Sequence, residues 1–194
     1  MVIALGSNLG GEEGSSLKVV EAAVARFAAL GLRPLARSSW WRSAAWPDPT
    51  QPDYINGVVI VETTAGPREV LDTLHRLEAE FGRERHVRNA ARTLDLDLIA
   101  YGRQVVDEPG LTLPHPRAAD RRFVMGPLAE IAPDWRHPVG GAGAAALAAS
   151  ASVGTDARPI AEPSSSGLSR GSRRQTQDDP AIECGILGPG PRMT

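Results

Sequence analysis

The sequence has little cysteine, no large excess of charge and no long apolar run, and each shortage excludes a class of protein. Its only cysteine is Cys184, which excludes an intramolecular disulfide framework and leaves a reducing cytoplasm as the simplest compartment. No apolar run approaches membrane-spanning length, and the opening MVIAL lacks the basic segment of a signal peptide. The net charge is -2, so any site for an anion must be local.

What the sequence does have is enough apolar material for one sizeable core. Of its 194 residues, 42% are hydrophobic, and we expect one domain over residues 1–160. From about Ala161 the composition changes to Ser, Gly, Pro and mixed charge. Such a stretch has too little apolar surface to offset the entropy cost of ordering, so residues 161–194 are predicted to be a disordered tail. The basic cluster of Arg170, Arg173 and Arg174 could contact nucleic acid, but a solvated tail is the favoured interpretation.

Hydrophobic periodicity predicts both strands and helices along the chain. Strands are expected within residues 2–5, 32–43, 55–63 and 92–101, and helices within 17–27, 67–81 and 121–131. The first six elements follow the order strand, helix, strand, strand, helix, strand. This order predicts an α+β fold, a ferredoxin-like βαββαβ sandwich with a C-terminal extension.

The stretch RTLDLDLIAY alternates leucines with two carboxylates, Asp95 and Asp97. On a strand these two side chains would stand on one face, about 7 Å apart along the chain. Two carboxylates at that distance repel unless a cation lies between them, and hard oxygen ligands that project together suit Mg²⁺. An antiparallel strand with one buried and one solvated face gives the same alternation, so these ten residues leave both interpretations open.

An arginine-rich segment, RERHVRNAAR, runs directly into this strand and supplies Arg83, Arg85, Arg88 and Arg92. Guanidinium groups at that density suit phosphate oxygens, although a solvated basic loop has the same composition. Four cations beside two carboxylates predict a triphosphate clamp around Mg²⁺. Further along, His115 is a candidate phosphate or nucleotide contact, or a structural histidine held between prolines.

Aromatic residues around the proline-rich stretch WPDPTQPD indicate a second ligand. Tyr54 and Asn56 follow this stretch, while Trp40, Trp41 and Trp46 precede it or begin it. A flat heterocycle could stack between aromatic rings, with Asn56 contacting its donors and acceptors. Packing in the core remains the alternative for any one of these aromatic residues.

Six stretches, in the same order along the chain, resemble the 6-hydroxymethyl-7,8-dihydropterin pyrophosphokinase family of the folate pathway. They are ALGSNLG (4–10), QPDYINGVV (51–59), LEAEFGRER (77–85), RTLDLDLIAYG (92–102), LPHPR (113–117) and RFVMGPLAEIAPDW (122–135). Together they span most of residues 2–138, so the resemblance is far more specific than any single motif. The predicted tail has no counterpart in the family.

The resemblance implies transfer of a pyrophosphoryl group from ATP to the hydroxymethyl oxygen of the pterin, with release of AMP. Asp95 and Asp97 would hold two Mg²⁺ ions, and Arg83 and Arg92 would stabilise charge at the attacked phosphorus. The implied ATP-binding residues are Arg83, Arg85, Arg88, Arg92, Leu98, His115 and Arg121. The implied pterin-binding residues are Ser43, Ala44, Trp46, Tyr54, Asn56 and Phe123. Glu78 matches a polar family position near this site.

Two departures from the family pattern concern substrate contacts. Asn89, Ala90 and Ala91 replace a Trp-Gly-Pro or similar run, which removes one aromatic contact to the pterin pocket, and Pro116 stands where an aromatic residue is frequent. Neither change removes a predicted metal ligand. We therefore expect an active, monomeric cytoplasmic enzyme that acts on ATP and the pterin, and that binds neither nucleic acid nor membrane.

The sequence also allows two alternative functions, a nucleotidyltransferase and an RNA-binding module. A nucleotidyltransferase also combines a Gly-Ser turn with an Asp-x-Asp strand, but there the turn lies shortly before the aspartates. Here Gly6 and Ser7 precede Asp95 by most of the domain. An RNA-binding module can use a ferredoxin-like sheet to present aromatic residues to bases, but the acidic pI of about 6.1 and the lack of an RNP-type aromatic strand in the sequence weigh against it.

Overall fold

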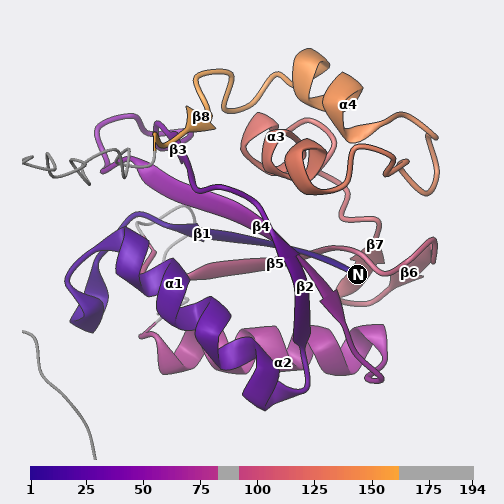
Figure 1. Cartoon of the computed structure of the whole chain (residues 1–194), viewed down its shortest axis with the longest axis horizontal. Coiled ribbons are helices and arrows are strands. Elements are labelled where there is room, and N and C mark those ends of the chain that lie inside the picture. Colours follow the sequence, from indigo (N-terminus) through magenta and orange to yellow (C-terminus); the bar gives the residue numbers. More distant parts are fainter. Residues whose placement is uncertain (83–91, 162–194) are drawn as a thin grey trace, which may run out of the picture. The chain divides into compact units, whose positions relative to one another are not determined.

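A six-stranded antiparallel sheet organises the chain up to Ala161 (Figure 1). The computed structural model describes residues 1–82 and 92–161. The predictions made for Arg83, Arg85 and Arg88, for the Asn-Ala-Ala departure, and for the tail after Ala161 lie outside the described residues.

The sheet contains the predicted strands and one further strand, β8 (Arg158–Pro159), that the sequence did not predict. Its strands are β1 (Val2–Ser7), β2 (Arg33–Arg37), β3 (Trp41–Ser43), β4 (Tyr54–Glu62), β5 (Asp95–Ala100) and β8, in the order β5-β1-β4-β3-β8 with β2 also beside β4. The helices are α1 (Ser16–Phe27), α2 (Pro67–Glu80), α3 (Arg122–Ile131) and α4 (Ala144–Ser150). A separate hairpin joins β6 (Val106–Glu108) to β7 (Leu111–Leu113). The α+β ferredoxin-like fold is confirmed, because the outer strands flank the β1–β4 pair and every pairing is antiparallel.

Local sequence accounts for most element boundaries. The hydroxyl of Ser15 accepts a hydrogen bond from the Lys18 N–H at 3.3 Å and so caps α1. Pro67 occupies the first turn of α2, where its missing N–H costs nothing. The strand predicted over 32–43 is divided into β2 and β3. At the break, the Ser38 hydroxyl accepts the Val58 N–H at 3.0 Å, so a side chain replaces a backbone partner.

The two faces of the sheet are covered by different helices (Figure 1). One core cluster packs α1 and α2 against side chains such as Ile3 and Leu5, whereas the other packs α3 and α4 against Val2 and Ala4. The central strand β4 is buried on both sides over much of its length, which explains its nearly continuous apolar sequence. Among the described residues, no helix combines the length and the apolar character needed to cross a bilayer.

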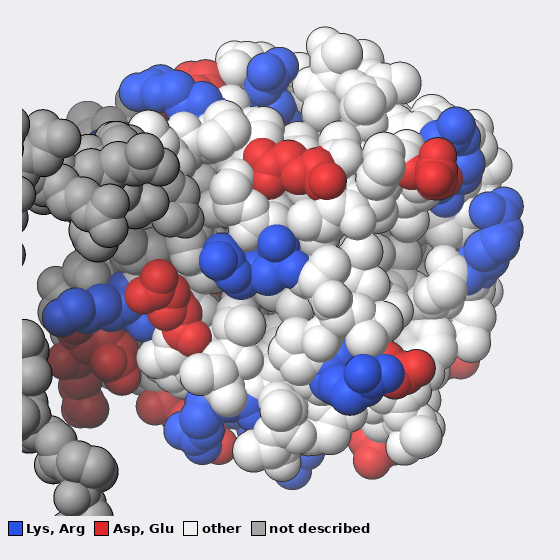
Figure 2. Space-filling model, viewed as in Figure 1, with Lys and Arg blue, Asp and Glu red and all other residues white. Residues whose placement is uncertain are grey.

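Charged side chains of both signs are interspersed over the face of the molecule in Figure 2. Several exposed ones form opposite pairs, including Arg26 with Glu80 at 2.8 Å and Arg68 with Glu108 at 3.4 Å. Such exposed pairs contribute little to stability. In the described part of this face, no patch of one sign extends across the surface.

Candidate active site

A cavity of about 260 Å³ lies on the sheet face that α3 covers. Side chains from β1, β3, β4, β5 and α3 meet there, together with residues of the connecting segments. Its lining residues are Ala4, Leu5, Gly6, Ser43, Ala44, Trp46, Tyr54, Asn56, Arg92, Asp95, Asp97, Arg117, Arg121, Phe123, Val124 and Val153. The structure therefore brings candidates for both predicted ligands around one hollow.

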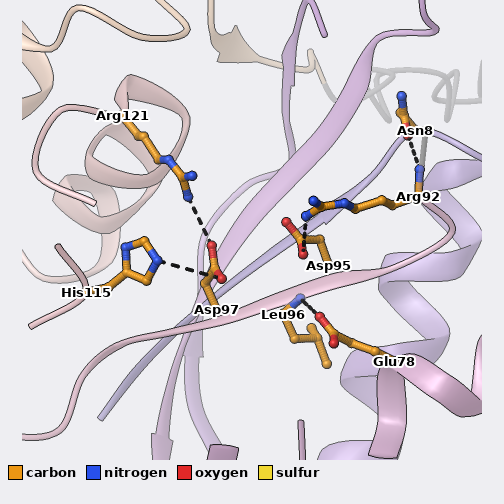
Figure 3. Close-up of polar contacts among 8 residues, drawn as sticks. All are labelled: Asn8, Glu78, Arg92, Asp95, Leu96, Asp97, His115 and Arg121. Carbon is orange, nitrogen blue, oxygen red and sulfur yellow. Dashed lines mark hydrogen bonds and ion pairs between the residues drawn. The ribbon is translucent and has the colours of Figure 1, made fainter. Parts of the chain in front are cut away.

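The two carboxylates of β5 stand on the same side of the strand and both line this cavity (Figure 3). The intervening Leu96 is buried in the opposite core, which α1 and α2 form. The side chains of Asp95 and Asp97 remain 24% and 31% exposed, so their oxygens are accessible to a ligand in the cavity. The alternation of β5 thus separates an apolar face from a face that carries negative charge.

Each carboxylate is paired with its own arginine, and the two arginines come from different parts of the chain. Arg92 Nη1 lies 2.8 Å from Asp95 Oδ1, and Arg121 Nη1 lies 3.0 Å from Asp97 Oδ2 (Figure 3). The arginine partners compensate the mutual repulsion of the two carboxylates. Because the geometry of a guanidinium group matches both carboxylate and phosphate oxygens, both arginines can exchange one partner for the other when a polyphosphate enters.

His115 also lies near the carboxylate of Asp97. Its Nε2 lies 3.9 Å from Asp97 Oδ1, and its Nδ1 accepts the Arg117 N–H at 3.3 Å. Burial lowers the pKa of the His115 imidazole below its ordinary value, and the nearby Arg121 and Arg117 act in the same direction, although Asp97 opposes them. The imidazole is therefore neutral at pH 7, and the Nδ1 bond assigns its proton to Nε2, which faces Asp97.

Asn8, which directly follows β1, joins two segments that border the cavity. Its side-chain oxygen accepts the Arg92 N–H at 2.7 Å, and its amide nitrogen donates to the Pro52 carbonyl at 3.2 Å. The Arg92 carbonyl in turn accepts the Asn8 backbone N–H at 3.1 Å. Asn8 is buried, so these bonds are protected from water. The turn after β1 thereby holds both the entry to β5 and the proline-rich segment.

Glu78 supports β5 from the face opposite the cavity (Figure 3). This carboxylate of α2 is 1% exposed, and its Oε1 accepts the Leu96 N–H at 2.7 Å. Among the described strands β5 is at the edge of the sheet, so none of them pairs with that N–H on its outer side. Glu78 therefore positions the strand that carries the two carboxylates and does not itself line the cavity.

All six residues assigned to the pterin from the sequence line the cavity: Ser43, Ala44, Trp46, Tyr54, Asn56 and Phe123. Asn56 donates from Nδ2 to the Ser43 hydroxyl at 3.0 Å, which fixes the orientation of its amide. Trp46 is 63% exposed and borders the opening. Trp40 and Trp41, considered above as aromatic candidates, are instead buried in the core, and Trp41 donates to Glu130 at 2.8 Å.

The residues assigned to ATP are divided between the cavity and a second hollow beside it. Arg92 and Arg121 line the cavity, whereas Leu98 and His115 line a hollow of about 200 Å³ that shares Asp97 with the first. Leu98 is largely buried, so only a small part of it reaches that hollow. Pro116, the second departure from the family pattern, lines the same hollow.

The structure adds residues that the sequence did not single out. Arg117 lines the cavity and lies within the LPHPR stretch, so this motif could have identified it as a site residue. Asn8 likewise lies within the ALGSNLG stretch. Val153 also lines the cavity, but no motif surrounds it, and only the packing of the chain brings it there.

The donor set of the cavity fits a magnesium ion that is shared with a substrate. In residues 1–82 and 92–161, no cluster of three or more His, Cys, Asp or Glu side chains forms a ready-made metal cage. Asp95 and Asp97 supply oxygen ligands from one strand face into an open cavity. Mg²⁺ is commonly bound by one or two carboxylates together with phosphate oxygens and water, which is what this arrangement allows.

Comparison with known proteins identifies relatives of this chain. The family model described as 7,8-dihydro-6-hydroxymethylpterin-pyrophosphokinase (HPPK) matches residues 2–133. The 2-amino-4-hydroxy-6-hydroxymethyldihydropteridine pyrophosphokinase of Synechocystis is 47% identical over 134 residues, which cover 69% of this chain and 68% of the relative. The Pseudomonas aeruginosa protein of the same name is 40% identical over 139 residues, covering 71% and 83%. That of Haemophilus influenzae is 41% identical over 137 residues, covering 70% and 83%.

Proposed function

The chain belongs to the 7,8-dihydro-6-hydroxymethylpterin-pyrophosphokinase family, and we propose that its 260 Å³ cavity is where the reaction takes place. The enzyme is a diphosphotransferase of folate biosynthesis that uses ATP as co-substrate. The hydroxymethyl oxygen of the dihydropterin attacks the β-phosphorus of ATP, and the bond from that phosphorus to the AMP oxygen breaks. The products are the pterin diphosphate and AMP, and the hydroxyl proton passes to solvent.

The two substrates approach the carboxylates from opposite sides. The pterin ring lies among Tyr54, Asn56 and Phe123, where rings are available for stacking and an amide for hydrogen bonding. The nucleotide lies toward the hollow lined by Leu98 and His115, with its phosphates directed to the arginines of the cavity. This arrangement places the reacting hydroxyl and the β-phosphorus beside β5.

The described residues stabilise the transferred group by position and charge. Asp95 and Asp97 would hold two Mg²⁺ ions, which would supply positive charge to neutralise the negative charge that develops on the phosphates. Arg92 and Arg121 turn from the carboxylates to the phosphate oxygens, because both guanidinium groups already point into the cavity. The neutral His115 offers its Nε2–H to a phosphate oxygen. Arg83, Arg85 and Arg88 would complete the clamp.

The site needs little covalent chemistry from the protein. Phosphoryl transfer depends mainly on holding the reactants in line and on electrostatic stabilisation, so a dedicated general base is not required. Asn8 and Glu78 contribute by holding Arg92 and β5 in place. We further propose that residues 1–160 work as one monomeric domain in the cytoplasm, with residues 161–194 as a tail.

One observation carries the proposal: two carboxylates on one strand face, each paired with an arginine, line the cavity that the pterin-side residues also line. The test combines the full chain with ATP, Mg²⁺ and 6-hydroxymethyl-7,8-dihydropterin. We expect AMP and the pterin diphosphate in equal amounts, and no turnover when EDTA removes the metal. Release of pyrophosphate in place of AMP would instead support the nucleotidyltransferase.

A further inference from the structure

We propose that Asp156 is a positioning residue for the pterin, acting through the wall of the cavity that Ser43 and Ala44 form. Asp156 belongs to a segment, residues 152–160, that we call the C-terminal strap. The strap lies after residue 133, where the match to the family model ends. The inference rests on the proposed position of the pterin at this side of the cavity.

The strap binds the N-terminal end of α3, where Phe123 lines the cavity. Val153 accepts the Arg122 N–H at 2.9 Å, and its own N–H donates to the Asp120 carbonyl at 3.1 Å. The Asp120 carboxylate accepts both the N–H and the hydroxyl of Ser152 at 2.7 Å. Four hydrogen bonds therefore join the start of the strap to Asp120 and Arg122, at the N-terminal end of α3.

Gly154 brings the strap against the ring of Phe123. A β-carbon at position 154 would lie 2.4 Å from Phe123 Cδ1, a distance that carbon atoms do not adopt without displacement. Gly154 also has a φ of +67°, in the left-handed region that favours glycine. Both requirements exclude a side chain here, so the backbone of the strap packs directly against one side of the Phe123 ring. Val153, the preceding residue, lines the cavity itself.

The other end of the strap binds the opposite wall. Strand β8 pairs with β3, and the Ile160 N–H donates to the Trp40 carbonyl at 2.8 Å. Between these two ends, Asp156 Oδ2 accepts the Ala44 N–H at 2.6 Å. Ala44 lines the cavity and directly follows β3, where the chain enters the proline-rich segment. The strap thus joins the two walls between which the pterin would lie, α3 and the end of β3.

The Asp156 hydrogen bond determines the orientation of the Ser43–Ala44 peptide. A trans peptide directs its N–H and its C=O to opposite sides, so a partner for the N–H also sets the direction of the Ser43 carbonyl. The bond is charge-assisted, which makes it stronger than a bond between neutral groups. Without it, the peptide could rotate, and a flat ligand between Ala44 and Phe123 would meet a wall of variable position.

The experiment measures pterin and ATP affinity separately in Asp156→Ala, Asp156→Asn and the wild type. For Asp156→Ala we expect the KM for the pterin to rise about tenfold, the effect of losing one charge-assisted hydrogen bond, while the KM for ATP changes less than about twofold. Asp156→Asn keeps an acceptor oxygen and should recover most of the pterin affinity. Asp134→Ala, an exposed acid outside the cavity, is the matched control and should match the wild type.

Gly154→Ala tests the other contact of the strap, with the wall that Phe123 forms. Its added methyl group displaces the Phe123 ring, so the KM for the pterin should again rise more than that for ATP. Thermal unfolding of each variant identifies loss of folding. Equal changes in both KM values, or an unchanged pterin KM in folded Asp156→Ala, would overturn the inference.

Direct titration of the pterin, followed by its fluorescence, separates this inference from the proposed reaction. A wild-type chain that binds the pterin but releases no AMP would contradict the reaction. The comparison of pterin affinity between the wild type and Asp156→Ala would still decide the role of the strap. Weaker binding in the variant would support it, and equal binding would overturn it.

Discussion

The sheet face that α1 and α2 cover and the face that carries the cavity differ in how far their side chains are buried. On the first, apolar side chains such as Leu74 and Leu96 are fully enclosed, and the buried carboxylate of Glu78 is used for a backbone hydrogen bond. On the second, Asp95 and Asp97 remain partly exposed and are balanced by arginines. Changes on the first face should therefore affect stability, and changes on the second should affect turnover.

The largest expected effect is on turnover, from a carboxylate of the cavity face. Asp97→Asn keeps the size of the side chain but removes its charge, and therefore its strength as a magnesium ligand. We expect turnover to fall about 1000-fold, equivalent to roughly 4 kcal/mol of transition-state stabilisation. Release of AMP from ATP measures it.

Asp107→Asn, on the exposed strand β6, is the control for this variant and should keep the wild-type rate. A rate near that of the wild type in folded Asp97→Asn would contradict the metal assignment. Asp95→Asn should behave in the same way as Asp97→Asn, because both carboxylates line the cavity from the same strand face.

The next effect belongs to the helix-covered face and should appear in stability. Leu74 is fully buried between α2 and the sheet, so Leu74→Ala should lower the free energy of unfolding by about 2–4 kcal/mol through lost burial and a residual cavity. Urea denaturation measures this change. The folded fraction should keep its pterin and ATP KM values.

Leu17→Ala is the matched control, because Leu17 is 38% exposed on α1 and should cost far less stability. If Leu74→Ala left stability intact and raised a KM value, the functional division between the two faces would be wrong.

A change at Glu78 should have a smaller effect on both stability and turnover, because this residue of the helix-covered face holds the strand that carries the two carboxylates. Glu78→Ala leaves the buried Leu96 N–H without its acceptor and should cost about 1–3 kcal/mol of stability. Turnover should fall as well, since Leu96 lies between the two carboxylates on β5. Denaturation and turnover are measured on the same preparation.

Glu78→Gln retains an acceptor oxygen and should preserve more of both properties than Glu78→Ala. Glu80→Ala removes only an exposed ion pair with Arg26 and serves as the control. A loss of stability in Glu78→Ala without any loss of turnover would show that β5 does not depend on this bond for its catalytic geometry.

The smallest expected effect is the pH dependence that His115 contributes. Its pKa is lowered by burial, so the unfolded chain binds a proton at a higher pH than the folded chain does. Stability from the neutral imidazole is fully present above its ordinary pKa of about 6.5 and is lost as pH falls toward the lowered value, by at most about 1.4 kcal/mol per pH unit. Between pH 7 and 5.5, His115→Gln should therefore lose less stability than the wild type. Equal slopes in urea titrations at several pH values would contradict this.

The order of the first six elements and the alternation on β5 could be predicted because both depend on short-range patterns. The Asp95 and Asp97 side chains share a face because a strand repeats every two residues, whatever surrounds it. The break between β2 and β3 could not be predicted, since it depends on the Ser38 hydroxyl meeting Val58 on a neighbouring strand. The pterin-side residues were identified through a resemblance between sequences, and the structure places them around one cavity.

By itself, the sequence determined the family, the ferredoxin-like order of strands and helices, and the pair of carboxylates. Only the tertiary structure decided which partners those groups meet. Arg121 reaches Asp97 across 24 residues, and Asp156 reaches the Ala44 N–H across 112. The physical reason is that periodicity and turn chemistry act between near neighbours. These contacts exist only after the sheet has formed and α3 and the strap have packed on the face that carries the cavity.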